Sequence, residues 1–162
     1  MPGGIFLLLG SNLGDRQENI AEAQRRIGLL GRLRTSPSYM TGAWGNKLQP
    51  DFINKVIEIE TKLPPEELLK NILAIETAMG RVRTEKWGPR VIDIDILFYD
   101  SQIVNTPDLT IPHPQIQFRK FALEPLNDIA GTFIHPVLKK TIEELLRECT
   151  DPLEVTRLPQ QP

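Results

Sequence analysis

Two aspartates at alternate positions of an apolar stretch carry the strongest chemical signal in this chain. The run from Val91 to Leu97 reads V-I-D-I-D-I-L, so an extended strand would place its isoleucines on one face and Asp93 and Asp95 on the other. Two carboxylates this close repel each other and cost stability. Mg²⁺ resolves that conflict, because it takes one or two Asp oxygens and completes its shell with water and phosphate oxygens. The pair therefore predicts a magnesium site, although a D-x-D motif alone also occurs on solvated strands.

Four cations immediately precede the two aspartates. They are Arg81, Arg83, Lys86 and Arg90, and Trp87 stands among them beside a Gly-Pro turn. Arginine binds phosphate oxygens through two parallel hydrogen bonds, so this cluster predicts a polyphosphate ligand next to the metal. Taken singly, the cations could form a solvated rim or neutralise the aspartates, and the tryptophan could belong to the core. Their combination with D-x-D is more specific than any one of them.

Two other positions have side chains that suit a ligand. Phe52 and Asn54 share one face of an expected strand, where a ring to stack on and an amide that donates and accepts would fit a flat heteroaromatic ligand. The alternative is a core phenylalanine and a loop-capping asparagine. His113 lies between two prolines, which hold it in an extended segment and allow its ring to face a ligand. The alternative there is an ordinary surface histidine.

The expected secondary structure can place these residues on one sheet. Strands are predicted over Ile5–Leu9, Leu33–Met40, Phe52–Glu60 and Val91–Phe98, with Pro37 indicating an edge or a bulge. A first helix starts at a capping box formed by Asp15 and Glu18 and runs to Gly31, and a second runs from Pro64 to Gly80. The continuous apolar run Ile5–Leu9 predicts a central strand buried on both faces.

This order, βαββαβ, predicts an α+β fold with a ferredoxin-like antiparallel sheet, its helices on one face and a site on the open face. A C-terminal extension follows. A hairpin is expected at Asp100-Ser101, a short strand near Ile103-Val104 and a short capped helix over 141–146. Residues 151–162 hold three prolines and two glutamines, and we expect them to be a frayed tail.

Composition narrows the class of protein. The chain has 162 residues and a net charge of −2, which predicts one domain over 1–162 and gives no basic field for nucleic acid. One cysteine and two histidines exclude a disulfide framework and a structural zinc site of four N or S ligands. No apolar stretch approaches eighteen residues and no leader pattern is present, so we expect a cytoplasmic protein without a membrane partner.

The motifs together resemble one enzyme family. Gly80-Arg81-Val82-Arg83, Trp87-Gly88-Pro89-Arg90 and Asp93-Ile94-Asp95 match G-R-x-R, W-G-P-R and D-x-D of the 6-hydroxymethyl-7,8-dihydropterin pyrophosphokinases. The opening Gly-Ser-Asn-Leu-Gly-Asp at 10–15 and the segment 49–54 are also similar to that family. The resemblance spans Ile5 to Glu148, nearly the whole chain.

The resemblance implies an activity and a set of roles. Such an enzyme transfers diphosphate from ATP to 6-hydroxymethyl-7,8-dihydropterin in folate biosynthesis, giving AMP and the pterin diphosphate. Two Mg²⁺ ions on Asp93 and Asp95 are implied as cofactors, and a monomer is expected. The implied catalytic residues are Arg81, Arg83 and Arg90; the ATP contacts are Lys86, Trp87, Arg90, Thr110, His113 and Arg119; the pterin contacts are Thr41, Gly42, Ala43, Trp44, Phe52, Asn54 and Phe121.

Two other classes of protein remain as alternatives. A ferredoxin-like module that binds RNA or small ligands would need exposed aromatics on its central strands, where this chain has aspartates. A two-metal nucleotidyltransferase or nuclease could use the same D-x-D motif, but it would act on nucleic acid without any dependence on a pterin.

Overall fold

The computed structural model describes residues 3–42, 50–80 and 91–159, and it has the expected α+β order. The elements are β1 (Ile5–Ser11), α1 (Arg16–Ile27), β2 (Arg32–Thr35), β3 (Tyr39–Thr41), β4 (Phe52–Glu60), α2 (Pro65–Ala78), β5 (Asp93–Tyr99), β6 (Val104–Asn105), β7 (Thr110–Ile111), the 3₁₀ turn η1 (Ile116–Phe118), α3 (Lys120–Ala130), α4 (Ile142–Glu148) and β8 (Val155–Arg157).

The main sheet has the strand order β5-β1-β4-β3-β8, with β2 also paired to β4. All of its pairs are antiparallel. Each βαβ unit leaves space for a strand of the other unit, as the βαββαβ prediction requires. Every residue of β1 is buried, which confirms the central strand expected from its continuous apolar run.

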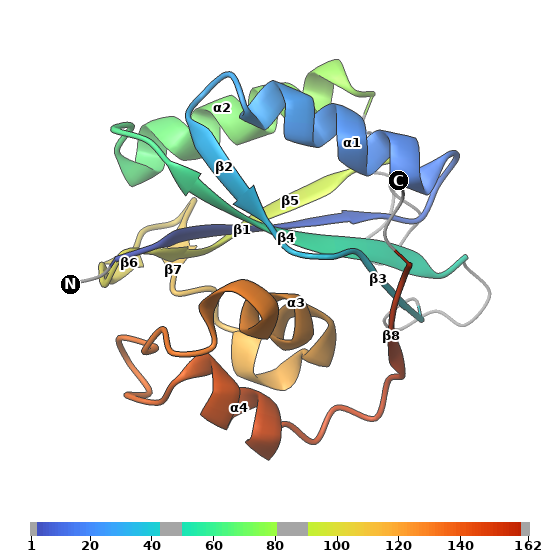
Figure 1. Cartoon of the computed structure of the whole chain (residues 1–162). Coiled ribbons are helices and arrows are strands. Elements are labelled where there is room, and N and C mark those ends of the chain that lie inside the picture. Colours follow the sequence, from blue (N-terminus) through green and yellow to red (C-terminus); the bar gives the residue numbers. More distant parts are fainter. Residues whose placement is uncertain (1–2, 43–49, 81–90, 160–162) are drawn as a thin grey trace.

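Helices cover both faces of the sheet, so the expectation of one open face is wrong (Figure 1). Ile5, Leu7 and Leu9 pack with α1 and α2 in one apolar cluster. Phe6 and Leu8 point to the other face, into a second apolar cluster between the sheet and helices α3 and α4. Because alternate β1 side chains are apolar on both sides, each face needs its own cover. The C-terminal extension supplies the second one.

The expected strand over Leu33–Met40 is split into β2 and β3, and Pro37 lies in the break. Proline has no N–H to donate to the ladder, so pairing cannot continue through it. The Ser36 hydroxyl accepts from the Val56 N–H at 2.9 Å, and the Ser36 N–H donates to the Val56 carbonyl at 2.9 Å. Residues 36–38 thus oppose only residues 55–56 of β4, which confirms the bulge expected at Pro37, although the strand was expected to continue through it.

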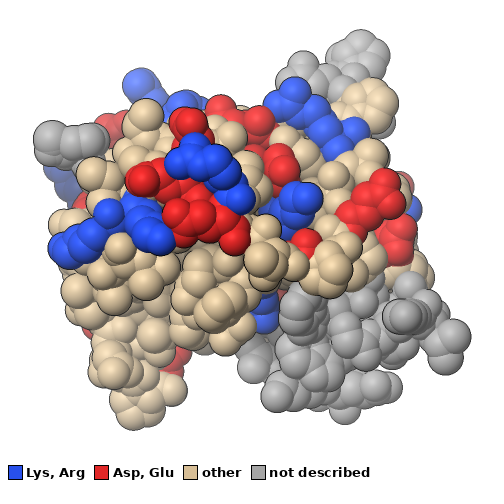
Figure 2. Space-filling model, turned by 90° about the horizontal axis from the view of Figure 1, so that it is seen from below, with Lys and Arg blue, Asp and Glu red and all other residues tan. Residues whose placement is uncertain are grey.

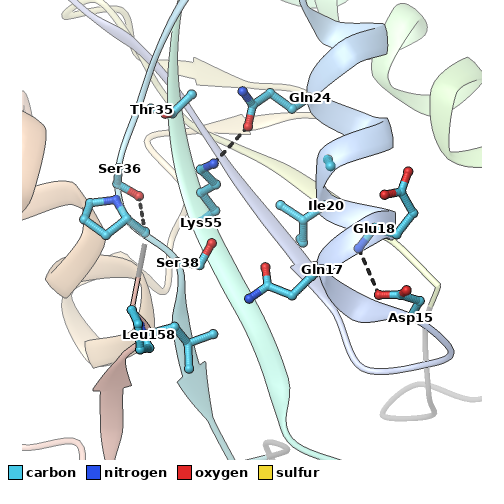
Figure 3. Close-up of a pocket in the computed structure, with 13 residues that line it drawn as sticks. Asp15, Gln17, Glu18, Ile20, Gln24, Thr35, Ser36, Ser38, Lys55 and Leu158 are labelled. Carbon is cyan, nitrogen blue, oxygen red and sulfur yellow. Dashed lines mark hydrogen bonds between the residues drawn. The ribbon is translucent and has the colours of Figure 1, made fainter. Parts of the chain in front are cut away.

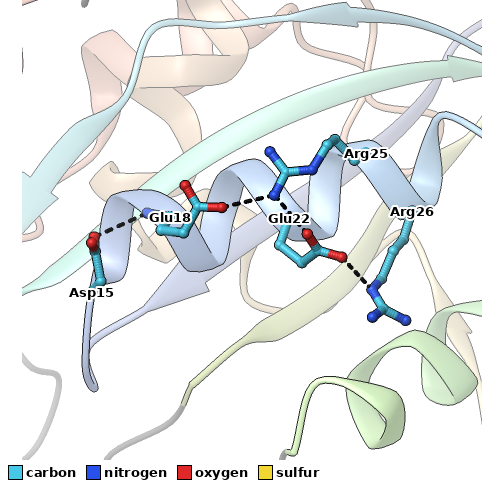
Figure 4. A network of polar contacts seen from close by, with 5 residues as sticks. All are labelled: Asp15, Glu18, Glu22, Arg25 and Arg26. Carbon is cyan, nitrogen blue, oxygen red and sulfur yellow. Dashed lines mark hydrogen bonds and ion pairs between the residues drawn. The ribbon is translucent and has the colours of Figure 1, made fainter.

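Helix α1 begins as expected but ends earlier. The Asp15 carboxylate accepts from the Glu18 N–H at 3.1 Å, whereas the Glu18 carboxylate binds Arg25 at 2.7 Å instead of closing a capping box (Figure 4). Arg25 also pairs with Glu22 at 2.6 Å. The helix stops at Ile27 with Gly28 as its C-cap, short of the expected Gly31. The exposed face of α1 is thus stabilised by its own ion pairs.

The segment after β5 turns as expected but pairs differently. Asp100 adopts a left-handed conformation with φ 53°, which turns the chain away from β5. The short strand β6 then pairs with β7 in a separate two-stranded sheet. The hairpin expected at Asp100-Ser101 would have paired this short strand with β5, and that pairing is wrong. A two-residue strand carries too little sequence pattern to predict which strand it pairs with.

The C-terminal segment differs from the frayed tail that its composition suggested. Val155–Arg157 form β8, which pairs with β3. The Leu158 N–H donates to the Ser38 carbonyl at 2.9 Å, and its side chain packs against the first cluster. The Lys120 N–H at the start of α3 donates to Asp151 at 3.1 Å. Pairing with an otherwise exposed strand edge orders this segment, and no local sequence pattern predicts such pairing.

Positive and negative side chains alternate on the face that carries α3 and α4 (Figure 2). On α4 and the turn before it, Lys140 pairs with Glu148 at 2.6 Å and Arg147 with Glu143 at 3.8 Å. These charges neutralise one another locally.

No helix among the residues that the structure describes is long and apolar enough to cross a bilayer.

His135 makes part of the stability of the fold depend on pH. It is 4% exposed, its Nδ1 accepts from the Val137 and Leu138 N–H groups, and burial lowers its pKa. Between its lowered folded pKa and its usual value near 6.5, the unfolded chain binds a proton that the folded chain does not. Stability should therefore fall as the pH drops below about 6.5.

We expect His135→Asn, which keeps an acceptor but cannot be protonated, to lose less stability than wild type between pH 7 and pH 5. Urea unfolding at the two pH values measures this difference. His113→Asn is the comparison variant. The pKa of His113 is also lowered, so this variant shows how much the second histidine contributes to the same pH dependence of stability. Equal losses in wild type and the His135 variant would show that another group controls this pH dependence.

Candidate functional site

One row of residues crosses the sheet on the face that carries α3. In the strand register, Asp93 of β5 stands opposite Gly10 of β1, Gly10 opposite Asn54 of β4, and Asn54 opposite Tyr39 of β3. Neighbouring strands are about 4.8 Å apart, so Asp93 and Asn54 lie about 10 Å from each other. A predicted metal ligand and a predicted ring-binding amide thus face one side of the sheet, with only a glycine between them.

The space that a side chain at Gly10 would need is filled by Asn54 and Phe52 of the neighbouring strand. A Cβ built on Gly10 would lie 2.9 Å from Asn54 Oδ1 and 3.5 Å from Phe52 Cδ1. Any larger residue would displace the buried amide, so glycine is required here by close approach. The sequence predicted no separate role for Gly10, and the alternation of β1 was the signal that could have placed it on this face.

Asn54 is 3% exposed, and its Nδ2 makes no hydrogen bond within the described part of the chain. A buried amide N–H without a partner costs stability, so such a group suggests a partner that arrives with a ligand. Phe52, two residues earlier on the same strand face, is half-buried at the start of β4. Together they present a ring and an unused donor side by side.

Asp93 and Asp95 are half-buried on the predicted face, while Ile92, Ile94 and Ile96 lie in the first apolar cluster, as their alternation indicated. Asp95 stands opposite Leu8 in the β1 register. No group of three or more His, Cys, Asp or Glu side chains that could hold a metal was found among the residues described. Two carboxylates that share an ion with phosphate and water oxygens suit Mg²⁺, which is rarely enclosed by protein ligands alone. The donor set therefore fits the predicted ion.

Glu76 supports the aspartate strand and was missed in the sequence. It lies on α2, is 3% exposed, and its carboxylate accepts from the Ile94 N–H at 2.8 Å. Among the strands that the structure describes, β5 lies at the edge of the sheet, so the outward N–H of Ile94 faces no neighbouring strand there. Glu76 holds the backbone between Asp93 and Asp95. A glutamate within a helix usually faces water, so only the tertiary structure identifies this role.

Glu76→Ala should lower the free energy of unfolding by about 1–3 kcal/mol, because it leaves the buried Ile94 N–H unpaired. Glu76→Gln keeps an acceptor and should lose less. Urea denaturation of both variants measures the difference, with the exposed Glu66 on the same helix as the control for replacement by alanine. Equal stability of the Glu76→Ala and Glu66→Ala variants would mean that the hydrogen bond contributes nothing.

His113 lies between β7 and η1, close enough to Asp93 and Arg119 for both charges to act on it. Its N–H donates to the Leu97 carbonyl at 3.0 Å, which fastens this segment to β5. Burial and the positive charge of Arg119 lower the pKa of His113 to about 4, and Asp93 opposes them. The neutral ring accepts the Gln115 N–H at Nδ1, at 3.1 Å, so Nε2 carries the hydrogen. His113 can therefore donate a hydrogen bond to a ligand oxygen at neutral pH.

Arg119 and Phe121 lie together at the start of α3. The Arg119 guanidinium carbon is 5.6 Å from the centroid of the Phe121 ring, within the range of a cation–π contact. Phe121 is half-buried against the second apolar cluster. The structure thus brings two more predicted residues to the side of the sheet that carries Asp93.

The turn between β1 and α1 holds the start of β4 in place. Asn12 Nδ2 donates to the Pro50 carbonyl at 3.3 Å, and Arg16 donates to the Asp51 carbonyl at 2.7 Å. These two carbonyls immediately precede Phe52. Asn12 of the Gly-Ser-Asn-Leu-Gly-Asp opening and the adjacent Arg16 thus fix the backbone just before Phe52, contacts that the sequence did not predict.

The remaining predicted residues divide into two groups. Thr41, opposite Phe52, is buried and donates to the Glu154 carbonyl at 3.2 Å; Gly42 follows it at the end of β3; Thr110 is exposed on β7. The others lie outside the described residues, and they are Ala43, Trp44, Arg81, Arg83, Lys86, Trp87 and Arg90.

A hydrophilic groove lies on the opposite face, between α1 and the β2–β3 edge (Figure 3). Lys55 reaches into it from β4 and donates to Gln24 at 3.0 Å, and burial lowers the pKa of Lys55. Its lining contains none of the predicted site residues. The groove is therefore separate from the row of Asp93, Gly10 and Asn54.

Comparison with known proteins gives one consistent result. Residues 6–131 match the family model described as 7,8-dihydro-6-hydroxymethylpterin-pyrophosphokinase (HPPK). The 2-amino-4-hydroxy-6-hydroxymethyldihydropteridine pyrophosphokinase of Synechocystis is 41% identical over 152 residues, which cover 91% of this chain and 77% of that protein. The Aquifex aeolicus protein of the same name is 40% identical over 147 residues, 90% of this chain and 92% of that one.

Among solved structures, the chain is similar to an HPPK-DHPS in complex with substrates. The TM-score is 0.70 at 17% sequence identity, and the match covers 90% of this chain. It covers 43% of that longer chain. This likeness concerns the fold.

Proposed function

Because this chain belongs to the 7,8-dihydro-6-hydroxymethylpterin-pyrophosphokinase family, the pyrophosphokinases of folate synthesis, we propose that it transfers diphosphate from ATP to 6-hydroxymethyl-7,8-dihydropterin. The pterin hydroxymethyl oxygen attacks the β-phosphorus of ATP and loses its proton. The bond from the β-phosphorus to the α-β bridging oxygen breaks, and AMP leaves. The products are AMP and the pterin diphosphate.

The observation that carries this proposal is the row that joins Asp93, Gly10 and Asn54 across three strands. The unused Nδ2 of Asn54 suits an acceptor on the edge of a pterin, and Phe52 suits its flat face. Asp93 faces the same space about two strand spacings away. That separation fits a ligand whose ring lies at Asn54 and whose hydroxymethyl group extends toward a polyphosphate at the aspartates.

Catalysis in this arrangement rests on placement and charge. Two Mg²⁺ ions held by Asp93 and Asp95 would neutralise charge on the attacking and leaving groups. Neutral His113 would donate from Nε2 to a phosphate oxygen, and Arg119 would bind another. We assign Arg81, Arg83 and Arg90 to the transferring phosphates, Lys86, Trp87 and Thr110 to ATP, and Thr41, Gly42, Ala43, Trp44 and Phe121 to the pterin.

We further propose that the enzyme is a cytoplasmic monomer and that residues 1–162 form one pyrophosphokinase domain. The shared contacts of the two apolar clusters with β1 support a single domain, because neither cluster can form without the sheet. Light scattering of the purified protein would test the monomer.

The decisive experiment mixes the protein with ATP, Mg²⁺ and the pterin and follows the nucleotide product. We expect AMP and pterin diphosphate, and no product when EDTA is added. ADP in place of AMP would indicate transfer of a single phosphoryl group. Product formation that needs nucleic acid and no pterin would favour a two-metal nucleotidyltransferase.

A further inference from the structure

Three side chains from distant segments meet next to Asn54. Tyr39 stands opposite Asn54 across the β3–β4 ladder, is 5% exposed, and donates its phenolic hydrogen to Asp128 of α3. Arg157 of β8 binds the other oxygen of Asp128 at 2.8 Å. The Arg157 guanidinium carbon also lies 6.0 Å from the centroid of the Tyr39 ring. One carboxylate on the helix layer therefore fixes side chains of two neighbouring strands.

The phenol of Tyr39 keeps its hydrogen over the whole working pH range. Burial and the hydrogen bond to Asp128 raise the pKa of Tyr39 to about 12. Tyr39 therefore remains a hydrogen-bond donor to Asp128 near neutral pH, and Arg157 binds the same carboxyl group. The contact should not vary with pH near neutrality.

Strand β8 depends on the same contacts and extends them. It pairs Tyr39 with Arg157 and Thr41 with Val155, and the Thr41 hydroxyl donates to the Glu154 carbonyl. Without β8, β3 would be a three-residue strand bonded only to β4. Residues opposite each other in a ladder have Cβ atoms about 5 Å apart, so a shift of Tyr39 is felt directly by Asn54.

We propose that Tyr39, Asp128 and Arg157 form a positioning network for the pterin site, which makes the C-terminal strand β8 part of that site. The inference rests on the proposed function, because it takes Asn54 as the residue that binds the pterin edge. The network would hold the Tyr39 ring against Asn54 and keep the amide in its binding geometry. None of the three residues needs to touch the reacting atoms.

Two variants test the network at its two ends. Tyr39→Phe removes the donor but keeps the ring, and Arg157→Gln removes the cation from a side chain that is 57% exposed. Each should raise the Kd for the pterin by about five- to tenfold, less than the direct loss of a hydrogen bond to a charged group, because the network acts on the ligand through Asn54. The Kd for a non-hydrolysable ATP analogue should stay within about twofold. Titration calorimetry measures both constants.

Arg34→Gln is the matched control. Arg34 also links the sheet to α3, because it donates to the Ile129 carbonyl at 2.6 Å and pairs with Glu58 at 2.7 Å. It stands on β2, in the register beyond the break at Ser36–Ser38. We expect its loss to lower the melting temperature as much as Arg157→Gln does and to leave pterin affinity unchanged. A merely structural role for Arg157 would make the two variants alike in both measurements.

The outcomes separate the network from the function. If wild type forms AMP and both network variants bind the pterin as tightly as wild type, the network proposal is overturned while the function stands. Equal loss of pterin affinity in the Arg34 variant would also overturn it. If wild type binds no pterin at all, the proposed function fails, and the network proposal fails with it.

Discussion

Replacing Asp93 or Asp95 by alanine should lower turnover by about a thousandfold or more and leave the fold intact. Each removes a carboxylate from the proposed magnesium site, and metal-borne charge stabilisation is worth several kcal/mol in a phosphoryl-transfer transition state. The strand itself has little reason to fail, because its buried isoleucines lie on the opposite face and Glu76 still holds the Ile94 N–H. Loss of one carboxylate also relieves repulsion from the other.

The measurement is the rate of AMP formation at saturating ATP, Mg²⁺ and pterin, together with circular dichroism of each variant. Asp108→Ala removes an exposed aspartate from the β6–β7 turn and should stay within about twofold of wild type. An independent readout comes from His113, whose pKa Asp93 raises. That pKa should fall further in Asp93→Ala. Turnover within threefold of wild type for both variants would remove the metal assignment.

Asn54→Ala should weaken pterin binding by about five- to 150-fold and change ATP binding little. The pterin edge would lose its partner at a buried position, which costs about 1–3 kcal/mol. The fold should stay close to wild-type stability, because the Nδ2 group makes no hydrogen bond within the described residues. Binding and stability are thus expected to separate at this position.

Calorimetry with the pterin and with an ATP analogue measures the two affinities, and urea denaturation measures the stability. Asn71→Ala on α2 serves as the control, since that amide is exposed and donates to the Glu67 carbonyl of its own helix. Equal losses for pterin and ATP would place Asn54 outside the pterin site. A large loss of stability would instead identify it as a core residue.

Local chemistry explains which elements were predictable. The alternation at 91–97 placed the isoleucines in the core and both aspartates on the other face, and the apolar run of β1 predicted burial on both sides. Pro37 predicted an edge or a bulge in the segment that the structure divides into β2 and β3, and Asp15 predicted the start of α1. Each of these features is written into a few neighbouring residues, because side-chain periodicity and backbone hydrogen-bonding capacity are local properties.

The predictions that failed concern partners far apart in the chain. The open face of the sheet is covered by α3 and α4, and the expected tail forms β8 against β3. The sequence of a short segment does not indicate which strand edge or apolar face, distant in the chain, it will pack against. Glu76 shows the same limit, because its buried carboxylate binds the backbone N–H of Ile94, eighteen residues later in the chain.

The sequence by itself determined the family, the order of the core elements and the chemical types of the expected site residues. Only the tertiary structure decided that Asp93, Gly10, Asn54 and Tyr39 form one row, because strand register arises from pairing between segments that are distant in sequence. It also decided that Gly10 leaves space for Asn54 and that Arg157 supports Tyr39. Spacing along the chain specifies which groups are available, and packing specifies which of them meet.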